Sequence, residues 1–169
     1  VFNLSIEIIP GETEALYSFL GALSISENKN SSLVIDIGGG STEIIIGDGK
    51  SILYRKSFPI GVVALSEKYF SNQPPTATEI HSMNDEIISV ISELKILKHD
   101  FKNSIAVAGT PTTLACIKSN LLSFDADKIE GSVLKPEDID KILIQLSHIT
   151  VDEMRSKFGN VVEGREDIL

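Results

Sequence analysis

The chain has 169 residues, which suits one domain or a slightly oversized one. Hydrophobic residues make up 42% of it and charged residues 23%, a composition typical of globular rather than disordered proteins. The formal net charge of −9 argues against a nucleic-acid backbone as the main partner, but it leaves room for a small phosphorylated molecule held at a local site.

Cysteine content and hydropathy bear on the compartment. Cys116 is the single cysteine, so no intrachain disulfide can form, which fits a reducing compartment. No stretch approaches the roughly 18 apolar residues that span a bilayer, and no signal peptide is visible before Pro10. We therefore expect a cytoplasmic protein with neither nucleic acid nor membrane as a partner. Because the chain lacks an initiator methionine, we also expect it to be a fragment.

Residues 1–24 are expected to form a strand and a helix. Ile6 to Ile9 has an alternating-to-apolar strand pattern that stops at Pro10 and Gly11. From Glu12 to Leu23, apolar residues recur at helical spacing. The first turn of this helix carries Glu14, and acids are favoured at the positive end of a helix dipole.

Three short strands are predicted next. Ser32 to Ile37 and Thr42 to Gly47 are apolar and are joined by a glycine-rich loop. Asp48 and Gly49 form a hairpin turn signal that leads to a third strand near Ser51 to Phe58. Sequential short strands with tight turns predict an antiparallel meander.

The loop between the first two strands is the most informative feature. Its glycines allow positive φ and close approach of a ligand, and consecutive backbone N–H groups can bind an anion. Asp36 and Glu43 flank the loop, and two such carboxylates can hold a divalent cation that bridges a bound phosphate. The predicted phosphate cradle consists of Gly38, Gly39, Gly40, Ser41 and Thr42. The plainer alternative is a flexible hairpin in which Asp36 caps a turn and Glu43 is solvated.

Helices and one buried strand are predicted for the rest of the chain. Val62 to Phe70 is expected to be a short helix. Thr76 and Glu79 have capping-box spacing at the start of a long helix whose apolar face extends to Leu97. The later predicted elements are a buried strand at 104–108, helices at 112–118, 136–148 and 151–157, and a loop at 124–130.

Gly109 and Thr110 follow the buried strand and admit two compatible interpretations. They can form a phosphate-side or nucleotide-side loop. They can also be an ordinary strand-to-helix turn, with Thr110 as the N-cap and Pro111 as the first helical residue.

Other reactive side chains give weaker signals. The three histidines lack metal-ligand spacing and are expected at the surface: His81, His99 and His148. Cys116 lies between apolar residues on a predicted helix and is expected to be buried. The charged run from Glu163 to Asp167 is expected to be a solvated face, with Arg165 as a weaker candidate for a phosphate contact.

The element order predicts an α/β fold with both glycine-bearing loops at strand ends, where such folds bind their ligands. Ile35 to Glu43 resembles the second phosphate loop of the exopolyphosphatase and guanosine pentaphosphate phosphohydrolase (Ppx/GppA) family, within the actin-like, sugar-kinase and heat-shock-chaperone ATPase superfamily. Further segments resemble the family in the same order: Glu7 to Ala15, Ser57 to Leu65, Ala108 to Ala115 and Gly164 to Leu169. The resemblance covers nearly the whole chain.

The resemblance implies roles for the candidate site residues. It makes Glu14 the catalytic general base and makes Asp36 and Glu43 the ligands of Mg²⁺, directly or through water. It also makes Gly109 and Thr110 further phosphate-binding residues.

The resemblance also implies a domain organisation. Residues 25–169 would form a ribonuclease H-like second domain, truncated at its C-terminus, while the family's first phosphate-loop domain would be absent. The full-length parent would be a homodimer, and the fragment would be inactive alone. Thr13 and Leu16 depart from the glutamate and arginine that are usual at these positions, which weakens the expected substrate contacts more than the base.

Three functions are consistent with these residues. The leading hypothesis is a phosphohydrolase that releases the terminal phosphate of inorganic polyphosphate or of guanosine pentaphosphate by metal-assisted attack of water. The second is an ATPase or kinase of the same superfamily, which needs an adenosine pocket. The third is a non-catalytic module that binds guanosine penta- or tetraphosphate, suggested by Thr13 and Leu16.

Overall fold

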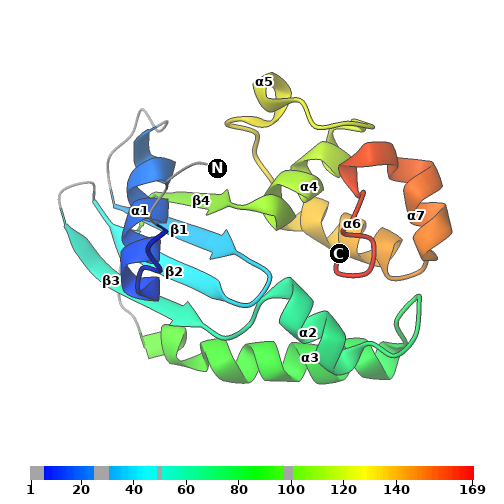
Figure 1. Cartoon of the computed structure of the whole chain (residues 1–169), viewed down its shortest axis with the longest axis horizontal. Helices are drawn as coiled ribbons and strands as arrows, with labels where there is room; N and C mark the ends of the chain where they lie inside the picture. The colour runs from blue at the N-terminus through cyan, green and yellow to red at the C-terminus, as the bar shows by residue number, and fades with distance from the viewer. Residues whose placement is uncertain (1–5, 25–30, 49–50, 97–100) are drawn as a thin grey trace.

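The computed structural model describes residues 6–24, 31–48, 51–96 and 101–169. A four-stranded mixed sheet with strand order β3-β2-β1-β4 lies at the centre of one half of the molecule (Figure 1). The strands are β1 (Ser32–Ile37), β2 (Thr42–Gly47), β3 (Ile52–Phe58) and β4 (Asn103–Val107). The predicted antiparallel meander of β1, β2 and β3 is confirmed, and β4 runs parallel to β1 at the edge of the sheet.

Helix α1 (Gly11–Ser24) covers one face of the sheet, as its apolar spacing predicts (Figure 1). Phe19 is 1% exposed and packs with Val34 and Ile45, which point to this face from β1 and β2. The approach is so close that a Cβ on Gly47 would lie 2.6 Å from the Phe19 ring. A glycine at the end of β2 therefore lets the helix seat against the sheet.

The opposite face of the sheet packs against α2 (Val62–Tyr69), α3 (Ala77–Val90) and the 3₁₀ helix η1 (Ile91–Ile96). Ion pairs join the solvent side of this layer: Lys68 with Glu86, and Lys56 with Glu93 at 2.5 Å. The hydroxyl of Tyr54 also donates to Glu93, and its pKa is raised to about 12 by burial and by that carboxylate.

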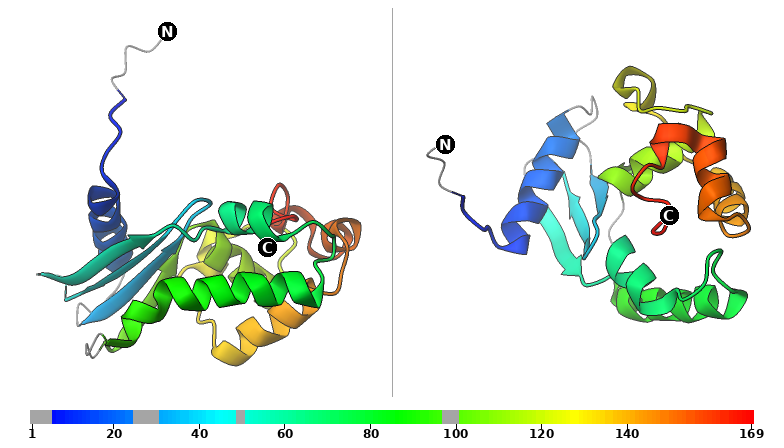
Figure 2. Two further views of the ribbon diagram at one scale, coloured as in Figure 1. Left: turned by 90° about the horizontal axis from the view of Figure 1, so that it is seen from below. Right: turned by 45° about the vertical axis from the view of Figure 1, so that its right-hand side comes forward.

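The remaining helices form a second apolar cluster at the other end of the molecule, as the right panel of Figure 2 shows. They are α4 (Gly109–Lys118), α5 (Ala126–Ile129), α6 (Pro136–Leu146), α7 (Val151–Phe158) and the 3₁₀ helix η2 (Gly159–Val161). Cys116 is 1% exposed in this cluster, which confirms that it is a buried apolar residue. Among the described residues, no helix has the length and apolarity required to cross a membrane.

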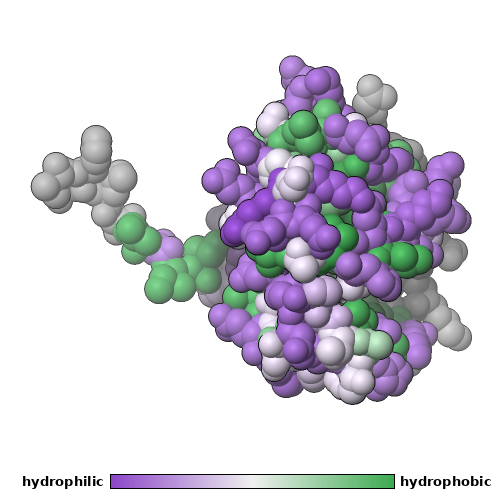
Figure 3. Space-filling model, turned by 90° about the vertical axis from the view of Figure 1, so that its right-hand side faces the viewer, coloured by the Kyte–Doolittle hydropathy of each residue, from purple (hydrophilic) through white to green (hydrophobic). Residues whose placement is uncertain are grey.

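The predicted strand before Pro10 is wrong for its described part. Residues 6–10 form no strand and extend away from the body (Figures 2 and 3). Ile6 and Ile8 are 90% and 95% exposed, so their apolar side chains find no packing partner in the described part of the chain. A strand pattern specifies a strand only when another strand accepts its hydrogen bonds.

Smaller differences have local causes. The helix that begins after Thr76 gives way to 3₁₀ geometry at Ile91, and Leu97 lies outside the described residues. The strand predicted at 104–108 runs from Asn103 to Val107 and is half-buried, because it is an edge strand with a neighbour on one side only. The loop predicted at 124–130 contains the single turn of α5.

Glu79 anchors the start of α3 in the predicted capping box. Its carboxylate accepts hydrogen bonds from the backbone N–H groups of Thr76 and Ser71, at 2.7 and 2.8 Å, and from the Asn72 amide at 3.0 Å. These bonds, first of all the one from the Thr76 backbone, lower the pKa of Glu79 to about 2. Because the folded pKa lies below the ordinary 4.5, the stabilisation is fully present above about pH 4.5.

We therefore expect Glu79→Gln to lower the melting temperature at pH 7, and the difference from wild type to shrink as the pH falls from 4.5 towards 2. Thermal unfolding followed by circular dichroism at several pH values measures this. Glu67→Gln on the exposed side of α2 is the matched control and should change little. A difference that stays constant across this pH range would contradict the role of the carboxylate.

Candidate functional site

Asp36 and Glu43 lie directly opposite each other in the antiparallel pair of β1 and β2. Residues 36, 43 and 45 alternate onto the α1 face of the sheet, so both carboxylates lie on that face. Asp36 Oδ2 accepts a hydrogen bond from Ser18 of α1 at 2.7 Å. Glu43 is only 4% exposed, and its Oε1 accepts from Ser57 of β3 at 2.6 Å. Glu43 is thus a buried acid rather than a solvated one.

These two carboxylates fit a divalent cation. In the described part of the chain, their side-chain partners are hydroxyl groups and neither makes an ion pair. Like charges directly opposite each other across two strands are destabilising, and a hard cation with oxygen ligands removes that repulsion. Each carboxylate retains one oxygen outside its serine hydrogen bond. No cluster of three or more potential ligand side chains occurs among the described residues, so a cation here would complete its shell with water or substrate oxygens.

Glu14 is exposed on α1, one turn before Ser18. Residues four apart on a helix share a face, and Ser18 contacts Asp36, so Glu14 is on the side of α1 that borders the carboxylates. The N-terminus of α1 overlies the end of the sheet that carries the glycine loop, because Gly11 and Ala15 line a pocket with Ser57. Glu14 therefore lies on the loop side of Ser18.

The glycine loop is held by α2 through its backbone. Gly38 N–H donates to the Ser41 carbonyl at 2.9 Å and closes the hairpin. The carbonyls of Gly38 and Gly39 accept from the N–H groups of Val62 and Val63, at 3.0 and 2.9 Å, so the loop caps the N-terminus of α2. None of the three loop glycines has positive φ, so the positive-φ part of the expectation for these glycines is wrong, while the close approach of a ligand stays a prediction. Gly39 is closely approached, since a Cβ there would lie 3.2 Å from a side-chain atom of Val63, whereas a Cβ on Gly40 would meet nothing within 4 Å.

The N–H groups of the loop remain available for a ligand. Gly39, Gly40 and Ser41 donate to no acceptor within the described residues, and both glycines are exposed. Since the carbonyls of Gly38 and Gly39 are turned to α2, a tip with free N–H groups presents partial positive charge. This geometry supports the predicted anion cradle at its backbone.

Thr42 is arranged differently from the rest of the predicted cradle. Its hydroxyl donates to the Ile60 carbonyl at 2.5 Å, which ties β2 to the segment before α2. Its side chain lines the opposite face of the sheet, at an apolar cavity of about 600 Å³ that also contacts Leu33, Ile35 and Ile44. The Thr42 side chain is therefore not grouped with Asp36 and Glu43, and the apolar cavity is separate from the carboxylate face.

The turn after β4 brings Gly109 and Thr110 to the same end of the sheet, because Val107 pairs with Asp36 in the parallel register. The predicted N-cap at Thr110 is wrong: α4 already begins at Gly109, and its N-cap is Ala108 with φ 75° and ψ −175°. This is a conformation that non-glycine residues rarely adopt, and such strain concentrates at functional sites. No side-chain hydrogen bond caps the N-terminus of α4, which begins directly after the end of β4.

Arg165 lies directly over this turn. A Cβ on Gly109 would be 1.7 Å from Arg165 Nη1, so only glycine admits the guanidinium. Arg165 Nη2 donates to the Thr110 hydroxyl at 3.2 Å. The expectation that residues 163–167 are a solvated face is wrong for Glu166, which is 5% exposed. Its carboxylate is paired with Arg155 of α7, a partner that sequence spacing does not reveal.

The described histidines are not part of the candidate site. His81 and His148 are exposed, as expected, and His99 lies outside the described residues. His81 faces Asp85 one turn away on α3. Neither described histidine is near Asp36 or the glycine loop in the contacts of the structure, so the candidate chemistry rests on carboxylates, backbone N–H groups and Arg165.

Fold and site together define an α/β domain in which a glycine loop lies beside two carboxylates, and comparison with known proteins identifies the family. A model of the Ppx/GppA phosphatase family matches residues 1–169. The chain belongs to the Ppx/GppA phosphatase family, whose members have the actin-like ATPase fold, so the predicted family and fold class are confirmed.

Individual relatives agree. The chain is 28% identical over 166 residues to exopolyphosphatase 2 of Mycobacterium tuberculosis, covering 96% of this chain and 51% of that protein. It is 30% identical over 116 residues to a guanosine-5'-triphosphate,3'-diphosphate pyrophosphatase of Pseudoalteromonas atlantica, covering 68% and 23%. The solved Ppx/GppA family member of Aquifex aeolicus superposes with a TM-score of 0.88 at 30% identity, covering 98% of this chain and 53% of that one. The chain thus spans about half the length of the Mycobacterium and Aquifex proteins.

Gly61 is packed directly against the backbone of the glycine loop. A Cβ at this position would lie 2.3 Å from the Gly39 carbonyl, a backbone atom that moves only if the loop moves. We expect Gly61→Ala to lower the free energy of unfolding by about 1–3 kcal/mol, as overpacking does. Urea unfolding measures the change.

Gly21→Ala is the matched control, because Gly21 lies within α1 and a Cβ there meets nothing within 4 Å. This substitution should raise the stability by roughly 0.5–1 kcal/mol. If Gly61→Ala were as stable as Gly21→Ala, the close contact between the glycine loop and α2 would be refuted.

Proposed function

We propose that this chain is the catalytic part of a phosphohydrolase that releases the terminal phosphate of inorganic polyphosphate or guanosine pentaphosphate. The observation that carries the proposal is the juxtaposition, at one end of the sheet, of paired carboxylates on Asp36 and Glu43 with the free N–H groups of the glycine loop. Relatives named as an exopolyphosphatase and as a guanosine pentaphosphate pyrophosphatase support the substrate class.

Different groups of the chain bind different phosphates of the substrate. The N–H groups of Gly39, Gly40 and Ser41 bind oxygens of the terminal phosphoryl group, which gains negative charge as the bond breaks. Gly109 and Thr110, at the start of α4, bind a further phosphate, and Arg165 adds a full positive charge there. This leaves the reacting phosphate at the glycine loop and the rest of the substrate towards α4.

Glu14 acts as the general base. An exposed carboxylate on the loop side of Ser18 can accept a proton from water as that water attacks the terminal phosphorus in line. The P–O bond to the penultimate phosphate breaks, and inorganic phosphate leaves. Asp36 and Glu43 hold Mg²⁺, which when bound neutralises phosphate charge. Ser18 and Ser57 orient these two carboxylates through their hydroxyl groups.

The proposal extends to the whole protein, in which residues 25–169 would form the second domain and residues 1–24 the strand and helix that precede it. We infer that the full-length parent supplies the first phosphate-loop domain and is a homodimer, and that this chain alone turns over little substrate, because half of a cleft cannot exclude water. Relatives about twice as long support the inference of a further domain. The cytoplasmic location stays a prediction.

We expect Glu14→Gln in the full-length protein to lower the rate of phosphate release by about 10²–10⁴-fold, the usual contribution of a general base. Parallel phosphate-release assays on polyphosphate and guanosine pentaphosphate measure it. Glu67→Gln, an exposed acid on α2, is the matched control and should leave the rate unchanged. Undiminished release by the Glu14 variant would exclude Glu14 as the base.

Metal dependence tests Asp36 and Glu43. We expect chelation by EDTA to abolish phosphate release and Mg²⁺ to restore it, and Asp36→Asn to raise the Mg²⁺ concentration for half-maximal rate on the order of tenfold or more, since one charged ligand is lost. Titration of the rate with Mg²⁺ measures this, with Asp85→Asn on the exposed side of α3 as control. An unchanged Mg²⁺ requirement would remove Asp36 from the metal site.

The same assays separate the alternatives. Turnover of ATP or phosphate transfer to a sugar, without cleavage of polyphosphate, would select a kinase or ATPase. Tight binding of guanosine pentaphosphate without turnover would select a non-catalytic binding module.

A further inference from the structure

The guanidinium of Arg165 is not neutralised within the described part of the chain. Its Nη2 reaches the Thr110 hydroxyl, which carries no charge. Its Nε is buried and has no acceptor. A buried donor without an acceptor costs free energy, so the geometry leaves Arg165 as a cation with an unfilled hydrogen bond at the turn that begins α4.

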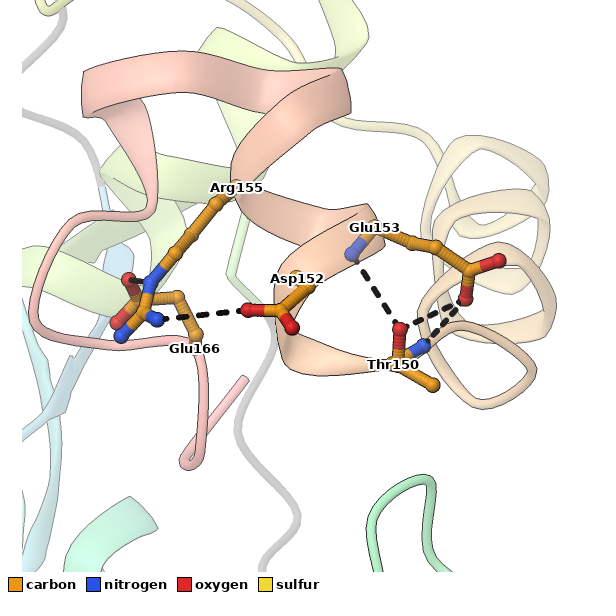
Figure 4. Close-up of polar contacts among 5 residues, drawn as sticks. All are labelled: Thr150, Asp152, Glu153, Arg155 and Glu166. Carbon is orange, nitrogen blue, oxygen red and sulfur yellow. Dashed lines mark hydrogen bonds and ion pairs between the residues drawn. The ribbon is translucent and has the colours of Figure 1, made fainter.

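An acidic neighbour makes this unexpected. Glu166 follows directly in the chain, is 5% exposed, and is a carboxylate that could serve as the counter-ion of Arg165. It is instead occupied by Arg155, whose Nε donates to Glu166 Oε1 at 2.6 Å from α7. Figure 4 shows Arg155 reaching from the helix to Glu166, with Asp152 on its other side. Asp152 lies 3.7 Å away and its side chain is 95% exposed, so it competes weakly.

The Arg155–Glu166 pair also fixes the backbone that carries Arg165. Residues 163–167 have no helix or strand to hold them, and Gly164 has φ 72°. The hydrogen bond from Arg155 lowers the pKa of Glu166, and backbone N–H groups of Glu166 and Arg165 act in the same direction. The ionised carboxylate of Glu166 is therefore bound on one side by α7 and on the other by the segment that presents Arg165.

We propose that Arg155 is a positioning residue: it neutralises Glu166 and so keeps the Arg165 guanidinium over Gly109, free to bind a phosphate group of the substrate. This inference rests on the proposed function, because it takes a phosphate as the anion at Arg165. Arg155 itself contacts no substrate. Without it, a nearly buried carboxylate loses its counter-ion, and Arg165, the adjacent cation with an unpaired Nε, is drawn to Glu166 and away from Thr110.

The neutralisation mechanism predicts a specific pattern of rescue. Removing Arg155 alone leaves Glu166 to capture Arg165, so phosphate binding weakens. Removing both charges, as in Arg155→Met with Glu166→Gln, leaves Arg165 without a competitor, so binding returns. If Arg155 had only a structural role, the double variant would bind phosphate no better than the single variant, because it loses the same ion pair and one more charged side chain.

The test is equilibrium binding of inorganic tripolyphosphate, by calorimetry with Mg²⁺ at fixed ionic strength, to the full-length protein with Glu14→Gln as the parent so that hydrolysis is suppressed. We expect Arg155→Met to raise the dissociation constant on the order of tenfold and the double variant to return to within about threefold of the parent. Arg165→Met should weaken binding as well, and adding Arg155→Met to it should have no further effect. Lys157→Met removes the same charge from α7 and is the matched control.

Two results would overturn the proposal: tripolyphosphate binding by the Arg155→Met variant that equals the parent's, or a double variant that binds as weakly as Arg155→Met alone. A parent that does not bind tripolyphosphate also overturns it. Failure of this proposal can be distinguished from failure of the proposed function. Tripolyphosphate binding can follow the predicted pattern in a protein that does not release phosphate, and a protein that releases phosphate can bind without this pattern.

Discussion

The contact between the glycine loop and the first turn of α2 is the constraint on which the site depends. Two loop carbonyls accept the N–H groups that a helix start leaves unsatisfied, so loop and helix complete each other's hydrogen bonds. This fixes the direction of the two peptide units whose carbonyls bond α2, and the N–H groups of Gly39 to Ser41 have no acceptor within the described residues. Gly61 makes the contact possible because any Cβ would collide with Gly39. The conformation of the proposed anion site is therefore set by the packing of the loop against α2 as well as by the loop sequence.

The chemistry of the site is divided between two sides. Acids on β1 and β2 lie under α1, while N–H dipoles and Arg165 lie towards α4. A phosphate with a bound cation can contact both, because its metal meets the carboxylates and its oxygens meet the donors. The overall negative charge of the chain is compatible with an anionic substrate for this reason, since the local field is set by a few oriented groups rather than by the sum.

Local patterns predicted most of the fold, and non-local pairings account for the rest. The bounds of β1 and β2 follow from apolar runs interrupted by glycines, and the capping box at Thr76 and Glu79 is a contact within four residues. The positive φ of Ala108 could not be predicted, because alanine carries no signal for it. The burial of Glu166 escaped prediction because its partner lies eleven residues away on another element. In the site, the sequence predicts the proximity of Asp36, Glu43 and the loop, whereas Thr42 faces away from them because it alternates with Glu43 along β2.

Strand alternation has a further consequence for how this chain finds its native pairing. The α1 face of β1 and β2 carries acids beside the loop, while the other face lines an apolar cavity. A slip of one residue would turn Asp36 or Glu43 into that cavity, and burying an unpaired carboxylate costs several kcal/mol. Misregistered sheets are thus penalised by the same two side chains that are proposed to hold the metal. Asp36 and Glu43 therefore favour the native strand register whether or not a substrate is bound.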